Sequence, residues 1–217
     1  MMKIGILGTG MVGKTIGSKL IELGHEVKMG SRIAGNEKAA EWVKQNGSAA
    51  AEGTFEDAAA FGEIVFNCTA GAVSLEALEM AGAENLNGKI LIDVANPLMR
   101  GELPSLVPSL SNTTSLSEEI QRAYPEVKVV KTLNTMHCNV MVNPLLVPGE
   151  HDVFICGDEK DAKAKVKEIL GWFGWQSSVD LGGLTAARST EMLSILWMPL
   201  FSLYSSPNFN LKVMVGK

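Results

Sequence analysis

Residues 1–32, MMKIGILGTGMVGKTIGSKLIELGHEVKMGSR, decide the fold of this 217-residue chain. The apolar segment Lys3–Leu7 predicts a buried strand, the next residues show helical periodicity, and Glu26–Gly30 predicts a second strand. Between the first strand and the helix stand three glycines with the spacing G-x-G-x-x-G, namely Gly8, Gly10 and Gly13. Glycines also mark ordinary turns, but the strand before them and the helix and strand after them favour a dinucleotide site.

Each glycine of this motif has a separate expected role. Gly8 allows the tight turn off the strand, Gly10 lets the backbone approach a pyrophosphate, and Gly13 lets the helix pack close to the sheet. The first turn of the helix directs unpaired N–H groups at the ligand, so phosphate binding there requires no cationic side chain. We therefore expect the loop, including Thr9, Met11 and Val12, to hold the diphosphate of a dinucleotide.

The end of the second strand indicates which dinucleotide is bound. A site for NAD usually places Asp or Glu there, to accept hydrogen bonds from the ribose hydroxyls. This chain has Ser31 and Arg32 instead, a hydroxyl and a planar cation that suit a 2′-phosphate. We therefore predict NADP as the cofactor, although a lone arginine at a strand end is also often just solvated. Lys38 adds charge to the same pocket or is a solvated helix residue.

Composition narrows the class of protein and its partners. The formal net charge is −5, so there is no basic surplus for nucleic acid or for an anionic membrane. Three cysteines lie far apart and form no C-x-x-C pair, which is typical of free thiols in a reducing compartment. With no signal peptide expected at the start of the sequence, we predict a cytoplasmic protein. Neither an H-x-x-x-H pair nor a carboxylate cluster occurs, so no metal site is predicted.

The later part of the chain continues the alternation of strands and helices, with a further strand predicted at Lys128–Thr132. Such alternation predicts crossover connections and a doubly wound, mostly parallel sheet of the α/β class, with a small helical region after it. We place the dinucleotide-binding domain at residues 1–181 and a small carboxy-terminal region at residues 182–217. The apolar stretch Met192–Tyr204 is too short and too interrupted to span a bilayer, and predicts a core or interface helix.

Four segments follow predicted strands and should meet at one cleft, because ligands bind outside the carboxyl ends of such strands. These segments are GTGMVG, TAGA (residues 69–72), ANPL (95–98) and LNTMH (133–137). Backbone groups of Thr69, Ala70, Gly71 and Ala72 are expected to flank the ribose and diphosphate. We expect Asn96 and Asn134 to pair with the nicotinamide carboxamide or with polar groups of the acceptor, and Pro97 to fix its loop against the nicotinamide ring. For each asparagine, a turn residue bonded to its own backbone is an equal alternative.

Two further features concern the rim of this cleft. The connection between Met99 and Ser115 is rich in Ser, Pro, Leu and Asn, and is a candidate loop over the cleft. His137 is the one histidine at the cleft edge, so it is the candidate for placing a proton or binding an acceptor. A hydrogen-bonded loop histidine is the alternative for that residue.

Taken together, the segments GILGTGMVG, GSR, VKTLNTM and PNFNLK resemble those of the NADP oxidoreductases that depend on a deazaflavin coenzyme. The resemblance covers nearly the whole chain and extends to the NADPH-binding domain of the STEAP ferric reductases. It implies a Rossmann-like domain, a small acceptor-binding region and a homodimer. The residues after GSR depart from the family pattern, so Lys38 is an uncertain counterpart of the family's lysine.

By matching motif, the resemblance also implies roles for individual residues. Thr9 to Val12 contact the pyrophosphate, Ser31 and Arg32 the 2′-phosphate, and Asn96 with Asn134, Thr135 and Met136 the nicotinamide side. The expected acceptor residues are Leu98, His137, Met198, Pro207, Asn208 and Phe209. The helix Met192–Tyr204 is expected to form the acceptor wall and the subunit contact.

These observations leave three functional hypotheses. The first is an NADP-dependent oxidoreductase that transfers hydride between NADPH and a deazaflavin or flavin-like acceptor. The second is a reductase of a small imine or carbonyl compound, as in pyrroline-carboxylate reductases, although those have a much larger helical region. The third is a non-catalytic NADPH sensor. Hydride transfer needs orientation and exclusion of water rather than an acid–base pair, and no such pair is evident in the sequence.

Overall fold

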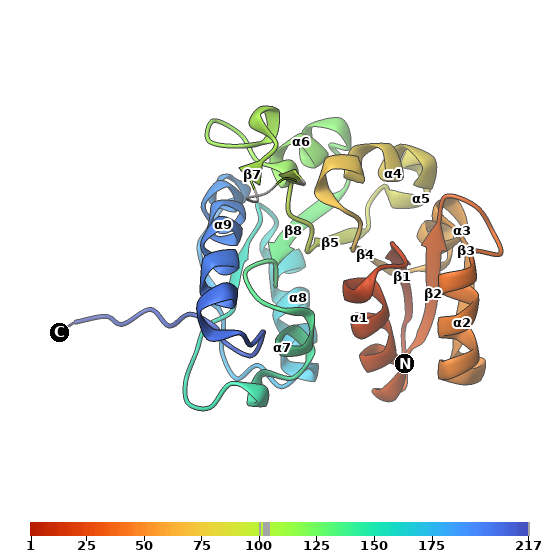
Figure 1. Cartoon of the computed structure of the whole chain (residues 1–217). Helices are drawn as coiled ribbons and strands as arrows, with labels where there is room; N and C mark the ends of the chain where they lie inside the picture. The colour runs from red at the N-terminus through yellow and green to blue at the C-terminus, as the bar shows by residue number, and fades with distance from the viewer. Residues whose placement is uncertain (100, 102–104, 217) are drawn as a thin grey trace.

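Within the residues that the computed structural model describes, 1–99, 101 and 105–216, one eight-stranded sheet organises the chain. Its strand order is β10-β9-β8-β5-β4-β1-β2-β3 (Figure 1). The strands are β1 (Lys3–Leu7), β2 (Glu26–Ser31), β3 (Ala50–Thr54), β4 (Ile64–Asn67), β5 (Ile90–Asp93), β8 (Lys128–Thr132), β9 (Phe154–Cys156) and β10 (Val179–Asp180). This architecture confirms the predicted Rossmann-like α/β fold.

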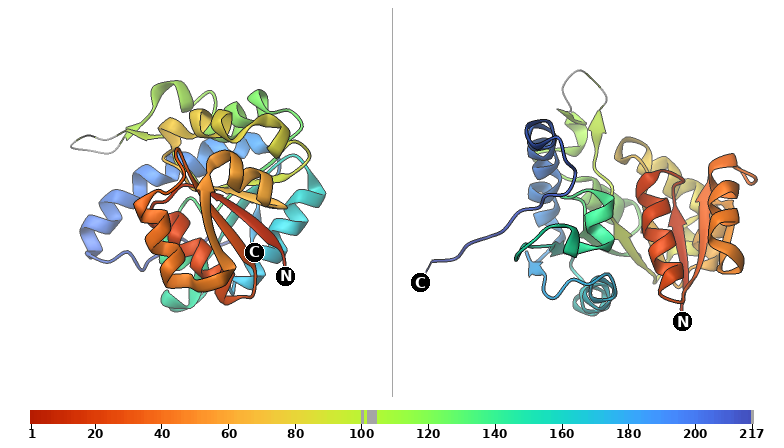
Figure 2. Two further views of the ribbon diagram at one scale, coloured as in Figure 1. Left: turned by 90° about the vertical axis from the view of Figure 1, so that its right-hand side faces the viewer. Right: turned by 60° about the horizontal axis from the view of Figure 1, so that its bottom comes forward.

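Nine helices are found in the same described residues: α1 (Met11–Glu22), α2 (Glu37–Asn46), α3 (Phe55–Phe61), α4 (Ser74–Ala81), α5 (Ala83–Leu86), α6 (Leu116–Ala123), α7 (Cys138–Val142), α8 (Lys160–Trp172) and α9 (Ala187–Tyr204). They cover both faces of the sheet (Figure 2). Buried residues of α1, α2, α7 and α8 share one hydrophobic cluster, and those of α3 to α6 share a second. Burial of apolar surface on both faces is what keeps such a sheet in place.

The sheet is parallel from β3 to β8, and its one antiparallel pair is β8 with β9. A parallel pair requires a long crossover, usually a helix, whereas β8 and β9 are joined by the five-residue helix α7 and an irregular segment. The direction of β9 was not predicted from the sequence, and the sheet is mostly parallel as predicted.

Several predicted elements have the expected bounds, and some structure was not predicted. β1 and β8 agree with the prediction, and α3 begins at a capping box in which Thr54 and Asp57 bond each other's backbone N–H. The expected loop over the cleft contains a short hairpin of β6 (Leu98–Met99) and β7 (Ser105–Leu106). Residues 100 and 102–104 of that loop lie outside the described part of the chain.

Helix α9 stands at the side of the sheet away from α1 and runs into an extended tail (Figure 1). Its first half is held by buried side chains, among them Thr190, Glu191 and Ser194, while Pro199 lies inside its second half. None of the helices in the described residues is long and apolar enough to cross a membrane. The division of the chain at residues 181 and 182 stays a prediction.

Candidate active site

The glycine loop between β1 and α1 has three glycines in three different environments. Gly8 has a φ of +118°, a conformation that favours glycine, and its N–H donates to the carbonyl of Gly30 on β2 at 3.0 Å. A Cβ on Gly13 would lie 2.3 Å from the carbonyl oxygen of Gly8, so helix and loop pack too closely for any side chain. A Cβ on Gly10 would meet nothing within 4 Å. The open space is therefore over Gly10, where the sequence motif expects a diphosphate.

The first turn of α1 faces the same open space. Gly10 is the N-cap, and within the described residues no side chain caps this end and no acidic residue lies in the first turn. The unpaired N–H groups and the helix dipole together favour an anion at this end. The residues present thus fit a bound diphosphate, which the backbone alone would hold.

Ser31 and Arg32 lie beside the glycine loop, because β2 is paired with β1. Ser31 is buried and its hydroxyl donates to the carbonyl of Ile33 at 2.5 Å. The side chain of Arg32 is 59% exposed, and its Nε lies 3.7 Å from Glu76 Oε1 on α4, a long and solvated contact. This guanidinium is available to a ligand phosphate. Lys38 is exposed in the first turn of α2.

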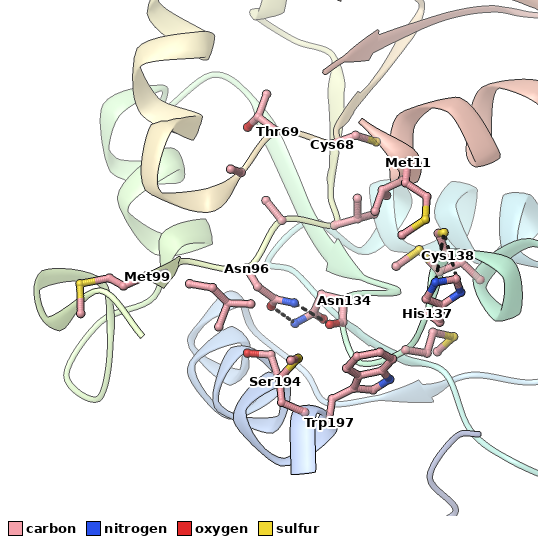
Figure 3. A pocket seen from close by; sticks show the side chains of 18 of the residues that line it. Met11, Cys68, Thr69, Asn96, Met99, Asn134, His137, Cys138, Ser194 and Trp197 are labelled. Carbon is pink, nitrogen blue, oxygen red and sulfur yellow. Dashed lines mark hydrogen bonds between the residues drawn. The ribbon is translucent and has the colours of Figure 1, made fainter. Parts of the chain in front are cut away.

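A cleft of about 770 Å³ opens at the carboxyl ends of the strands, between α1 and α9 (Figure 3). Ten of the sequence-predicted site residues line it: Met11, Val12, Thr69, Ala70, Asn96, Leu98, Asn134, Met136, His137 and Met198. Nine further lining residues were not predicted individually: Cys68, Val94, Ala95, Met99, Gly101, Cys138, Met141, Ser194 and Trp197. The volume and the mostly apolar lining are typical of a site for a small organic ligand.

Asn96 and Asn134 meet on the floor of the cleft and bond to each other (Figure 3). Asn134 Nδ2 donates to Asn96 Oδ1 at 2.9 Å, and Asn96 Nδ2 donates to the backbone carbonyl of Asn134 at 2.7 Å. Neither amide is bonded to its own turn. Because this pairing uses much of their hydrogen-bonding capacity, the asparagines act first on each other, which ties the loop after β5 to the loop after β8.

The segment from Thr69 to Ala72 reaches the cleft only at its start. The Thr69 hydroxyl lies 2.7 Å from Asn67 Oδ1 and from Ser74 Oγ. A Cβ on Gly71 would lie 2.3 Å from the carbonyl oxygen of Asn96, so the two loops pack backbone against backbone. Gly71 and Ala72 therefore shape the loop, as does buried Pro97, and these three residues do not line the cleft.

His137 and Trp197 form an aromatic side of the cleft. Their ring planes differ by 16° with centroids 6.3 Å apart, and Phe209 stacks on Trp197 at 5.4 Å. His137 Nδ1 accepts the backbone N–H of Asn139 and so caps α7, which leaves Nε2 to carry the proton of the neutral ring. Burial lowers the pKa of His137, so the neutral form dominates at neutral pH.

The remaining predicted residues lie near the cleft without lining it. Thr135 is buried next to Asn134 in the chain, and Phe209 stacks on Trp197. Pro207 is half-buried and Asn208 is exposed in the tail after α9, and neither is a lining residue. A tail after a helix has no periodicity that fixes its path, so its contacts could not be placed from the sequence. Ser194 and Trp197 were detectable in principle, because they share the helical spacing of Met198.

Comparison with known proteins adds independent evidence. Residues 3–97 match the family model described as "NADP oxidoreductase coenzyme F420-dependent". A solved structure from Arthrobacter sp. FB24, assigned as an F420-dependent NADP-reductase, is 45% identical with a TM-score of 0.92, and the match covers 99% of this chain and 100% of that one. The F420-dependent NADP reductase of Methanocaldococcus jannaschii is 28% identical over 98% of each chain.

Another relative is a larger protein. Metalloreductase STEAP3 of Rattus norvegicus is 30% identical over 91% of this chain, and this chain spans only 37% of that protein's length. The likeness to the Arthrobacter protein extends over both chains from end to end, and the fold and the glycine loop described above agree with it. This chain therefore belongs to the family of coenzyme F420-dependent NADP oxidoreductases, and it is an NADP-dependent oxidoreductase.

Proposed function

We propose that the protein transfers hydride between NADPH and a deazaflavin of the coenzyme F420 class. The observation that carries this proposal is one cleft that is lined both by the first turn of α1, directly after the glycine loop, and by an aromatic side. Met11 and Val12, in the first turn of α1, line the same cleft as Trp197 and Met198 of α9. An apolar cleft with an aromatic side suits a planar ring system, and two relatives carry F420 in their names.

Each group of residues has a proposed role in this reaction. The backbone around Gly10 binds the diphosphate, and Ser31 with Arg32 binds the 2′-phosphate. NADPH, when bound, supplies the hydride, which passes directly to the acceptor ring. The floor at Asn96 and Asn134 and the apolar lining orient the two rings and exclude water, which is the main protein contribution to such a transfer. His137, neutral with a proton on Nε2, is placed to donate a hydrogen bond to the acceptor.

The acceptor is tested by oxidation of NADPH with coenzyme F420, FMN, FAD and pyrroline carboxylate in parallel. We expect turnover with F420 at a kcat/KM at least about tenfold above that of the other acceptors, because only a fitted ring gains full orientation. A preference for pyrroline carboxylate would instead support imine reduction. Micromolar NADPH binding without turnover of any acceptor would support a sensor.

The aromatic side can be tested separately from the cofactor. Trp197→Ala is expected to raise the KM for the acceptor about tenfold or more through loss of stacking area, while the Kd for NADPH changes less than about threefold. Met192→Ala is the matched control, because Met192 lies on the same helix but is 50% exposed and does not line the cleft. Equal effects of the two substitutions would contradict an acceptor role for Trp197.

The choice of NADP over NAD depends on Arg32. Arg32→Ala is expected to raise the Kd for NADPH by about 10- to 100-fold and that for NADH less than about threefold, since the lost partner is the 2′-phosphate. Glu76→Gln is the control: it removes the carboxylate beside Arg32 and should leave NADPH binding equal or tighter. Isothermal titration calorimetry with both nucleotides measures this, and an equal loss for both would refute the assignment.

We also propose that α9 forms the contact of a homodimer. Leu196 and Leu203 are 46% and 72% exposed, and their spacing of seven residues places them on one helical face. Leu196→Asp combined with Leu203→Asp should raise the dimer dissociation constant at least about 100-fold, because two buried charges would oppose association. Leu145→Asp, at an 88% exposed site elsewhere, is the control. Light scattering after gel filtration measures the mass, and a wild-type monomer would refute the proposal.

A further inference from the structure

Three fully buried charged side chains form a cluster directly below the cleft floor. Lys131 Nζ lies 2.9 Å from Asp93 Oδ2 and 2.9 Å from Glu191 Oε1, and all three residues are at most 1% exposed. Lys131 Nζ also donates to the carbonyl of Ala95. An ammonium has three donors, so these three bonds satisfy it completely. None of the three charged residues lines the cleft, and the proposed reaction does not use them.

Each partner of Lys131 belongs to an element that shapes the cleft. Asp93 is the last residue of β5, and Ala95 immediately precedes Asn96 of the floor. Glu191 lies on α9, three residues before Ser194 and seven before Met198, so the three share one helical face. Ser194 and Met198 both line the cleft. The ammonium of Lys131 therefore connects the floor with the wall that α9 forms.

A second bond runs parallel to this connection. Asn134 Nδ2 donates to the carbonyl of Thr190, the neighbour of Glu191 on α9, at 3.0 Å. Between Lys131 and Asn134 the backbone turns at Leu133, whose φ of +64° is rare for a residue other than glycine. Such a conformation persists where the surroundings determine it, as the bonds on either side of Leu133 do here.

The cluster also reaches the cofactor side of the cleft. Asp93 Oδ1 accepts a hydrogen bond from Asn67 Nδ2 at 2.9 Å, and Asn67 Oδ1 in turn accepts one from the hydroxyl of Thr69. Thr69 lines the same cleft as Met11 and Val12 in the first turn of α1. A continuous chain of hydrogen bonds thus joins Thr69, the floor and α9 through Lys131.

Stability alone does not account for three buried charges. The free energy lost by removing a buried ion pair from water is about as large as the free energy gained from the attraction between its charges. Well-packed apolar side chains of similar volume often stabilise a fold equally well. One ammonium faces two carboxylates here, and N–H and O–H donors offset the remaining charge. Leu116 N–H, at the start of α6, donates to Glu191 Oε2 at 3.0 Å, and the Ser117 hydroxyl donates to Asp93 Oδ2 at 2.6 Å. Hydrogen bonds are directional, whereas apolar packing is not. These bonds therefore fix the position of α9 relative to the floor.

We propose that Lys131 and Glu191 are positioning residues that set the gap between α9 and the Asn96–Asn134 floor. By setting this gap they determine how the acceptor ring lies over the nicotinamide. The proposal rests on the proposed function for its consequence in catalysis, but the spacing itself is a property of the chain and can be measured without an acceptor.

The test is a graded series at Glu191 with a control on the same pair of helices. Glu191→Leu removes the bond to Lys131, and Glu191→Gln keeps a weaker, uncharged one. Arg188→Met is the control: Arg188 on α9 bonds Glu118 on α6 through Nε and Nη2 at 2.8 and 2.6 Å, but this bridge does not reach the floor. The measurements are the Kd for NADPH, KM and kcat for the acceptor, and hydrogen–deuterium exchange of residues 94–98 and 192–199.

We expect Glu191→Leu to lower kcat/KM for the acceptor about tenfold or more, and Glu191→Gln about threefold, because small misplacements of reacting groups cost large factors in rate. The Kd for NADPH should change less than about twofold in both, and exchange should rise in the two segments. Arg188→Met should leave all of these at wild-type values. If Glu191→Leu does not fold, Glu191→Gln decides by the same criteria.

Two results would overturn the proposal. One is that Glu191→Leu has the kinetics and the hydrogen–deuterium exchange of the wild type. If Glu191→Leu does not fold, the same result in Glu191→Gln overturns the proposal. The other is an equal effect of Arg188→Met, which would show that any weakening of the α6–α9 contact suffices. If the wild-type protein turns over no acceptor, the proposed function fails on its own, and the exchange data still decide whether Glu191 positions α9.

Discussion

Gly10→Val is expected to weaken NADPH binding by at least about 100-fold, or roughly 2.7 kcal/mol, and to leave the fold intact. Gly10 has φ −76° and ψ −179°, which any residue adopts without strain, and its Cβ would meet no atom within 4 Å. The valine side chain therefore occupies only the space that we assign to the diphosphate. Fluorescence titration with NADPH measures the change in affinity, and thermal unfolding of the free protein shows whether the fold is intact.

Gly13→Ala is the matched comparison for this substitution. Its single methyl group would lie 2.3 Å from the carbonyl oxygen of Gly8 and 3.2 Å from the Ile6 side chain. The backbone at Gly8 cannot move aside as easily as a flexible side chain. We therefore expect the free energy of unfolding of the free protein to fall by about 1–3 kcal/mol. If Gly10→Val bound NADPH as tightly as the wild type, the diphosphate would not lie over this loop.

Lys131→Met is expected to lower the free energy of unfolding by about 3–5 kcal/mol, the cost typical of removing one partner from a buried ion pair. Methionine fills a similar volume, so the loss comes from Asp93 and Glu191, which would remain buried without their cation. Although burial opposes a charged lysine, the two carboxylates together raise the pKa of Lys131, so the ammonium is present in the folded protein at neutral pH. Chemical denaturation at neutral pH measures the difference.

Two further variants show whether charge is the cause. Combining Lys131→Met with Asp93→Asn and Glu191→Gln removes all three charges and should recover at least half of the lost stability. Lys19→Met breaks the Lys19–Glu22 bridge, which has the same 2.9 Å separation but lies at the surface, and should cost less than about 1 kcal/mol. A triple variant no more stable than Lys131→Met would show that packing, and not charge, dominates the cluster.

Much of the fold follows from local patterns in the sequence. The segments Lys3–Leu7 and Lys128–Thr132 contain the β-branched and apolar residues that are typical of strands, and the structure has both strands with those bounds. The antiparallel direction of β9 in the sheet was not predicted, because strand direction depends on the path of the connection and not on the residues of the strand. Helix α7 was missed for a similar reason, since five residues are too few to show helical periodicity.

Local sequence patterns were enough to identify the glycine loop, the Ser31–Arg32 pair beside it, and the edge of the sheet where a ligand is expected. These depend on short-range rules: the backbone freedom of glycine, strand and helix periodicity, and the position of residues at strand ends. The folded structure was needed to show that Asn96 and Asn134 bond to each other, that His137 caps α7, and that Trp197 lines the cleft. The tertiary structure also brings Lys131, Asp93 and Glu191 together, because contacts between residues 38 and 60 positions apart arise from packing in three dimensions, which no local spacing encodes.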